Sequence, residues 1–131
     1  MRNHVQLADA YYRLSDEERK YGESASITNQ RTIVREYCEK HGIILVEEFA
    51  DDGYSGGNFE RPGFRAMLEH LKTGKVNMVI TKDLSRMGRN YLQVGMFTEI
   101  TFPKKGVRFI AINDGVDSAQ GDNDLTPLKN L

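Results

Sequence analysis

Four short apolar runs alternate along the chain with segments of helical periodicity, and this order constrains the fold more than any other feature. The runs cover residues 7–14, 43–49, 76–81 and 107–112. Helical patterns lie between them, over residues 26–41, 62–72 and 91–102. Parallel strands need a long crossover, usually a helix, so this order predicts an α/β fold. We expect three layers: a mostly parallel sheet of about four to five strands with helices on both faces.

Length and composition fit one globular domain. The chain has 131 residues, 39% hydrophobic and 28% charged, which is enough for a single hydrophobic core. No stretch approaches the roughly 18 apolar residues of a membrane span, so we expect no membrane partner. The single cysteine, Cys38, cannot form an internal disulfide, and no Cys/His cluster suggests zinc. We therefore expect a reduced, cytoplasmic protein with no metal or other cofactor.

Charge is unevenly distributed, although the formal net charge is only −1. The first third of the chain is acidic. The region 61–89 is basic, with Arg61, Arg65, Lys72, Lys75, Lys82, Arg86 and Arg89 against Glu69 and Asp83. Local patches of this kind govern binding to anions more than the net charge does.

The first apolar run ends on Y-Y-R-L-S, residues 11–15. Residues two apart on a strand point to the same face, so Tyr11, Arg13 and Ser15 would project together. Burying an arginine there is costly unless an anion lies nearby. The strand end therefore indicates a site for a negatively charged ligand.

Further polar side chains follow the second and third predicted strands: Asp51, Asp52, Ser55, Asp83, Ser85, Arg86 and Arg89. In open α/β sheets, ligands bind outside the carboxyl ends of the strands, where these loops meet. We expect Arg86 and Arg89, three apart at a helix start, to share a face. Serine, carboxylate and arginine at one edge favour a phosphate or phosphodiester as the ligand.

Each of these residues, taken alone, also has an ordinary structural interpretation. Ser15 could be a turn or cap residue, and Arg86 and Arg89 could be solvated. Gln30 lies on the apolar face of its helix and needs a buried partner, whether or not it belongs to a site. No histidine lies close in sequence to Ser15, so a Ser-His-Asp triad has little support.

Taken together, the segments resemble the catalytic domain of the serine recombinases, the resolvase/invertase family. The similarity is greatest to the large serine recombinases and transposon resolvases of mobile elements. It covers essentially the whole chain. Five segments occur in the family's order: Y-Y-R-L-S (11–15), S-I-T-N-Q (26–30), F-A-D-D-G-Y-S-G (49–56), E-R-P-G-F (60–64) and K-D-L-S-R-M-G-R-N-Y (82–91).

The resemblance implies a role for each matched position. Ser15 is the expected nucleophile, and Arg13, Arg86 and Arg89 are the expected clamp on the scissile DNA phosphate. The expected supporting residues are Gln30, Asp51, Ser55, Arg61, Tyr11, Asp83 and Ser85. The small resolvases carry an aspartate directly before the Arg86 position, where this chain has Ser85. The general base and the choice between Asp51 and Asp52 therefore stay open.

The resemblance also implies the reaction and the partners. Serine attack would leave a 5′-phosphoserine and a free 3′-OH without metal or ATP, followed by strand exchange through subunit rotation in a tetramer and religation. The partners would be specific DNA sites and further copies of the protein, as dimer and tetramer, in a bacterial cytoplasm. Residues 1–124 would be the catalytic domain. Residues 125–131, with Thr126 as cap and Pro127 in the first turn, would begin a helix leading to oligomerisation and DNA-binding regions outside this sequence.

Three other functions compete with this interpretation. A metal-dependent nuclease or phosphotransferase would hold Mg²⁺ on Asp51, Asp52 and Asp83. A catalytically silent oligomerisation module would keep the fold alone. A flavodoxin-like nucleotide binder would need a Gly-rich phosphate loop after the first strand, which the sequence lacks.

Overall fold

The computed structural model describes residues 5–57 and 59–120, which contain a five-stranded sheet in the order β2-β1-β3-β4-β5. Its strands are β1 (Leu7–Leu14), β2 (Ile44–Asp52), β3 (Met78–Thr81), β4 (Arg108–Ala111) and β5 (Val116–Asp117). The first four are mutually parallel, and β5 pairs antiparallel with β4. The predicted mostly parallel sheet is therefore confirmed.

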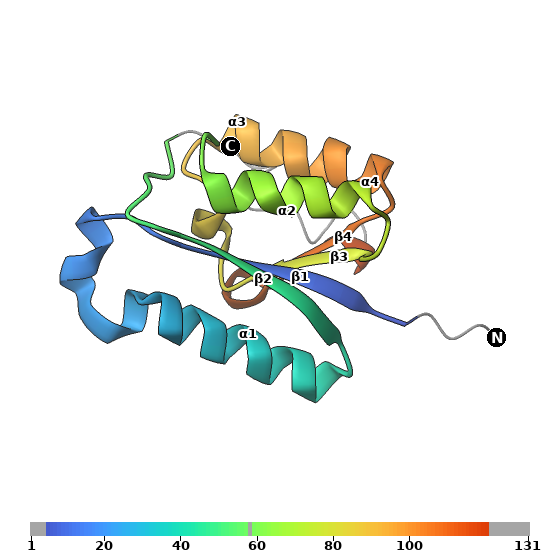
Figure 1. Ribbon diagram of the computed structural model, residues 1–131, viewed down its shortest axis with the longest axis horizontal. Coiled ribbons are helices and arrows are strands. Elements are labelled where there is room, and N and C mark those ends of the chain that lie inside the picture. Colours follow the sequence, from blue (N-terminus) through green and yellow to red (C-terminus); the bar gives the residue numbers. More distant parts are fainter. Residues whose placement is uncertain (1–4, 58, 121–131) are drawn as a thin grey trace.

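Helices cover both faces of this sheet, as expected (Figure 1). Helix α1 (Ile27–His41) lies on one face. On the other lie α2 (Pro62–Lys72) and a continuous helical stretch formed by α3 (Tyr91–Gly95), the π-helical η3 (Met96–Thr101) and α4 (Phe102–Lys104). Each face has its own buried apolar cluster, one under α1 and one under α2 and the 91–104 stretch. The two clusters sandwich the sheet, and burial of their apolar surface supplies most of the folding free energy.

Local signals explain where the first two helices begin and end. The Ser26 side chain accepts a hydrogen bond from the Asn29 backbone N–H, which caps α1. Gly42 ends that helix with φ of 68°, a left-handed conformation that glycine adopts without strain. Pro62 occupies the first turn of α2, where its missing N–H costs nothing. The two helices thus match their predicted ranges to within one residue.

The structure corrects four details of the sequence-based prediction. Strand β2 continues to Asp52, three residues further than expected, because it stays paired with β1 as far as Leu14. The charged segment that follows β1 has a composition typical of a loop, but it forms the 3₁₀ segment η1 (Glu17–Ala25). The polar tail after residue 113 likewise indicates a loop, but it contains the short strand β5. The helical stretch that begins at Tyr91 continues through Pro103 to Lys104, two residues beyond the predicted end at Phe102.

Three short 3₁₀ turns complete the described chain: η2 (Leu84–Arg86), η4 (Ile112–Asp114) and η5 (Ser118–Gln120). The predicted helix start at Thr126 and Pro127 lies outside the described residues. Within the described residues, no helix combines the length and apolar character needed to cross a membrane.

Candidate active site

Ser15 follows the last residue of β1 and is partly buried. Its hydroxyl donates a hydrogen bond to Glu18 Oε1 over 2.9 Å, and its backbone N–H donates to the same oxygen over 3.0 Å. The Glu18 backbone N–H in turn donates to Ser15 Oγ over 3.2 Å. The candidate nucleophile is therefore held in a tight turn by the first residues of η1.

Arg86, at the end of η2, shares the Glu18 carboxylate with Ser15. Its Nη2 donates to Glu18 Oε2 over 2.5 Å, and its Nε donates to Asp83 Oδ1 over 3.1 Å. A third bond runs from Arg86 Nη1 to the backbone oxygen of Arg13. The Arg86 side chain is 7% exposed, so a guanidinium lies buried directly beside the candidate nucleophile.

Arg13 is buried, and backbone carbonyls hold its guanidinium. It donates to the carbonyl oxygens of Ser85 (2.5 Å), Arg86 (3.2 Å) and Tyr54 (3.1 Å). Burial and the charge of Arg86 lower the pKa of Arg13 to about 10, while Glu18 opposes this. Arg13 therefore stays charged at neutral pH and fixes the turn that carries Arg86.

Gln30 has the buried partner that its position required. Its Oε1 accepts from the Arg13 N–H over 3.1 Å, and its Nε2 donates to the Arg13 carbonyl over 2.9 Å and to that of Ala25 over 3.1 Å. This pair of bonds joins α1 to the end of β1. Gln30 therefore sets the backbone position of Arg13.

Arg61, Tyr11 and Asp51 form a buried chain behind the site. Arg61 donates to the Tyr11 hydroxyl over 3.0 Å and to the carbonyl oxygens of Arg86 (3.1 Å) and Met87 (2.5 Å). The Tyr11 hydroxyl donates to Asp51 Oδ2 over 2.7 Å. Burial is the main reason that the pKa of Tyr11 is raised, so the phenol stays protonated. The chain supports the Arg86 turn from the side of the sheet opposite α1.

Asp51 and Asp52 differ in their surroundings. The buried Asp51 carboxylate accepts from the backbone N–H groups of Gly63 (2.7 Å) and Phe64 (2.9 Å) at the N-terminus of α2. The exposed Asp52 forms an ion pair with Arg19. The structure thus brings Asp51, and not Asp52, into the network around Tyr11 and Arg61.

Arg89 and Ser55 lie at the exposed rim. Arg89 Nη2 donates to Ser55 Oγ over 3.0 Å, and the Arg89 backbone N–H donates to Gly56 O over 2.8 Å. The expectation that Arg86 and Arg89 share a helix face is wrong, because the 3₁₀ turn that holds Arg86 ends before the helix begins at Tyr91. Arg89 instead projects from the link between the two elements, where a ligand can reach it.

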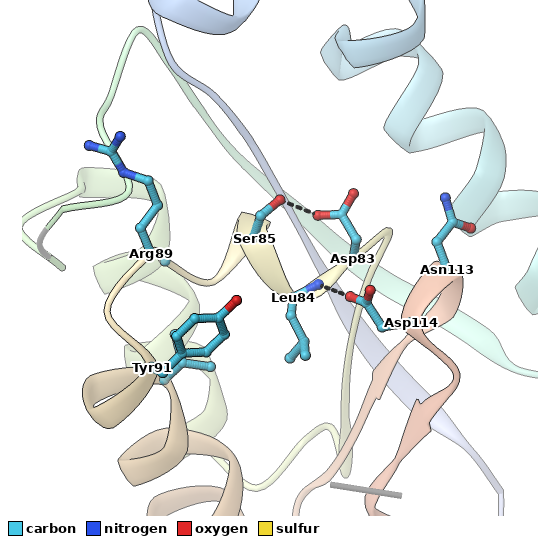
Figure 2. Close-up of a pocket in the computed structure, with 9 residues that line it drawn as sticks. Asp83, Leu84, Ser85, Arg89, Tyr91, Asn113 and Asp114 are labelled. Carbon is cyan, nitrogen blue, oxygen red and sulfur yellow. Dashed lines mark hydrogen bonds between the residues drawn. The ribbon is translucent and has the colours of Figure 1, made fainter. Parts of the chain in front are cut away.

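Ser85 and Asp83 contact each other, with Ser85 Oγ donating to Asp83 Oδ1 over 2.5 Å (Figure 2). Ser85 Oγ also accepts from Arg86 Nη2 over 2.9 Å. Figure 2 shows Arg89 at the other end of this turn, extended away from both. The negative charge of Asp83, two residues before Ser85, therefore partly neutralises the positive charge of Arg86.

Two cavities flank this turn. One, of about 200 Å³, is lined by Arg13, Ser15, Glu18 and Arg89 among others. The other, of about 450 Å³, lies between the turn, the start of α3 and Asp114 (Figure 2). Ser85 and Arg89 line both. The smaller cavity is the one that gives a ligand access to the Ser15 hydroxyl.

The three aspartates of the metal-dependent alternative do not converge. Asp51 caps α2, Asp52 pairs with Arg19, and Asp83 contacts Ser85 and Arg86. Over residues 5–57 and 59–120, no group of three or more His, Cys, Asp or Glu side chains is placed to hold a metal ion. The carboxylates present therefore do not form the ligand set that Mg²⁺ chemistry would need.

Glu18 is the residue at this site that the sequence analysis missed. It stands in the polar, acidic segment after β1, where a carboxylate is usually solvated. Its spacing of three from Ser15 is the signal that could have pointed to it, since this spacing allows a side chain to close a turn. Burial raises the pKa of Glu18, but hydrogen bonds from Arg86 and Ser15 outweigh burial and lower it to about 2.

This lowered pKa predicts a pH-dependent stability. Glu18 should stabilise the fold fully above its ordinary pKa of 4.5, and the contribution should disappear as pH falls through about 2. Urea denaturation over this range should show wild type more stable than Glu18→Gln above pH 4.5 and the two converging toward pH 2. Glu17→Gln, a matched change at an exposed neighbour, should follow wild type. A constant gap between wild type and Glu18→Gln would contradict the assignment.

Comparison with known proteins gives one consistent result. The family model described as "Resolvase, N terminal domain" matches residues 8–126. The N-terminal catalytic domain of TP901-1 integrase superposes with a TM-score of 0.82 at 26% identity, covering 95% of this chain and 92% of that chain. A resolvase family site-specific recombinase from Streptococcus pneumoniae superposes with a TM-score of 0.78 at 28% identity, covering 95% and 84%.

A curated relative is much longer than this chain. A candidate DNA recombinase of Bacillus subtilis (strain 168) is 28% identical over 103 residues, which are 79% of this chain and 20% of the relative. The chain therefore spans about a fifth of the length of that protein.

Proposed function

The chain belongs to the resolvase family of serine recombinase catalytic domains, and from this premise we propose that Ser15 cleaves DNA by direct attack on a phosphodiester. Ser15 Oγ forms a bond to phosphorus while the bond from phosphorus to the 3′ oxygen breaks. The hydroxyl proton leaves Ser15, and the 3′ oxygen takes up a proton. The product is a 5′-phosphoserine and a free 3′-OH, and reversal with a different 3′-OH rejoins the strands.

One observation carries this proposal: a single carboxylate, Glu18, binds both the Ser15 hydroxyl and the Arg86 guanidinium. An anion at this position can therefore contact the nucleophile and a buried cation at once. Attack on a phosphodiester gathers negative charge on the non-bridging oxygens, and stabilising this charge is the main task of such a site. Arg86 supplies the stabilising positive charge from a fixed position, and Arg89 can add a second guanidinium from the rim.

The other matched residues act through position. Gln30 and Arg13 fix the end of β1 and the η2 turn, while Arg61, Tyr11 and Asp51 support the same turn from behind. Ser55 orients Arg89. We assign no residue as general base. The proposed partners are specific DNA sites and further copies of the protein, which assemble as a dimer and a tetramer. The proposed location is the cytoplasm.

The test is a covalent adduct that depends on Ser15. The natural protein that contains this sequence is incubated with DNA from the ends of its own genetic element, in EDTA, and then denatured. We expect a protein–DNA adduct that Ser15→Ala abolishes and EDTA leaves unchanged, because the phosphoserine forms without metal. Metal-dependent cleavage that survives Ser15→Ala would overturn the proposal and return the aspartates to consideration.

A further inference from the structure

We infer that Glu18 occupies the place of the scissile phosphate in the DNA-free protein, so that DNA must displace this carboxylate before Ser15 can react. The inference rests on the proposed function and concerns the regulation of that same site. It makes Glu18 an internal competitor of the substrate.

The contacts of Glu18 are those that a phosphodiester would need. Its two oxygens accept from Arg86 over 2.5 and 3.4 Å, and Oε1 also accepts from Ser15 Oγ over 2.9 Å and from the Ser15 N–H over 3.0 Å. Arg13 Nη1 lies 3.7 Å from the same oxygen. The non-bridging oxygens of a phosphodiester likewise share one negative charge and accept hydrogen bonds from arginine, hydroxyl and amide donors.

A phosphate cannot simply join Glu18 at this position. Arg86 directs its remaining donors to Asp83, the Arg13 carbonyl and Ser85 Oγ. Arg86 already binds two carboxylates, those of Asp83 and Glu18, and both would repel a third anion strongly where water is scarce. Protonation does not relieve the repulsion near neutral pH, because Arg86 and Ser15 hold the pKa of Glu18 far below that range. The carboxylate has to move.

The segment that carries Glu18 can move at low cost. None of the residues of η1 is buried, so lifting the segment exposes little apolar surface. Surface links hold most of it: Arg19 pairs with Asp16 and Asp52, and Lys82 Nζ donates to the Ser24 carbonyl over 2.7 Å. The buried Gln30 binds only its last residue, through the Ala25 carbonyl. Gly22, with φ of 78° and ψ of −155°, interrupts the helical conformation of η1 and supplies a bend that other residues rarely adopt.

Glu18 as the general base is the competing interpretation, since its carboxylate accepts a hydrogen bond from the Ser15 hydroxyl. A base is most effective when its pKa lies near the working pH, and a carboxylate with a pKa of about 2 is far from it. The two roles predict opposite effects of removing the Glu18 charge. If Glu18 competes with DNA, its removal accelerates the reaction; if Glu18 is the base, its removal slows the reaction.

The first experiment measures anion binding in the 131-residue chain without DNA. Inorganic phosphate is titrated while the Ser15 amide, which donates to Glu18, is followed by NMR. We expect Glu18→Gln and Glu18→Ala to bind phosphate at least about tenfold more tightly than wild type, because one competing charge is gone. Glu36→Gln removes the same charge from an exposed position on α1, away from the cavity that holds Ser15, and should bind like wild type. Equal phosphate affinity in wild type and both Glu18 variants would overturn the inference.

The second experiment measures the rate of adduct formation by the natural protein on DNA. Glu18→Gln should form the Ser15 adduct faster than wild type, and a large loss of rate would identify Glu18 as the base and overturn the inference. The two proposals fail separately. An adduct that persists in Ser15→Ala would refute the recombinase chemistry, whereas phosphate binding unchanged by Glu18→Gln would refute only the competitor.

Discussion

Replacing Arg61 with methionine is expected to lower the free energy of unfolding by about 1–3 kcal/mol, the usual cost of leaving a buried hydrogen-bond acceptor without its donor. Arg61 is 1% exposed and lies against the rings of Tyr11, Phe59 and Phe64. The substitution would leave the carbonyls of Arg86 and Met87 without this donor in the interior. Methionine keeps the apolar length of the side chain, so the loss reports on the donors.

Urea denaturation monitored by circular dichroism checks this prediction. The matched control is Arg65→Met, on the helix α2 that begins just after Arg61. Its side chain is 67% exposed and its ion pair with Glu60 spans 3.4 Å. We expect the control to change stability by less than about 1 kcal/mol, as is usual for surface pairs. Similar losses in both variants would show that Arg61 acts through helix α2 in general and not through its carbonyl partners.

Replacing Arg86 with lysine is expected to slow formation of the Ser15 adduct by about 10²–10³-fold, the usual effect of removing one oxyanion donor. Lysine keeps the charge but cannot present a planar fork of donors, which Arg86 divides among Asp83, Glu18 and the Arg13 carbonyl. Single-turnover measurement of the adduct, with the natural protein in excess over DNA, gives the rate.

Arg35→Lys is the control for that substitution, because Arg35 lies on α1 and pairs with Glu48 at the surface. It should leave the adduct rate unchanged. Thermal denaturation separates chemistry from folding: Arg86→Lys should remain folded at the assay temperature. A wild-type rate in a folded Arg86→Lys variant would contradict the role of Arg86.

The arrangement of layers could be predicted because it depends on local periodicity. Residues 27–41 have apolar side chains at helical spacing, a serine cap and a terminal glycine, all visible in the sequence. Strand β5 was not predicted, since a two-residue strand has no periodicity of its own and exists through its pairing with β4. The extension of β2 to Asp52 likewise depends on the register with β1.

The composition of the site could be predicted better than its contacts. The sequence places Ser15, Arg13 and Arg86 at one sheet edge, and the structure brings them together. The sequence could not show that Arg13 binds carbonyls, because every residue has a carbonyl and only the fold determines which carbonyls lie near the guanidinium. The choice between Asp51 and Asp52 needed the strand register, and Glu18 resembled an ordinary solvated carboxylate until its partners were placed.

The carbonyl contacts of Arg13 and Arg61 have a consequence for how this sequence can vary. The two guanidiniums bind the main-chain oxygens of residues 85, 86 and 87, and these oxygens are present whatever side chains the turn carries. The path of the turn is thus encoded by β1 and by the residue that precedes α2. A substitution at Ser85 should therefore remove the contacts of its hydroxyl with Asp83 and Arg86 but leave in place the carbonyl that Arg13 binds.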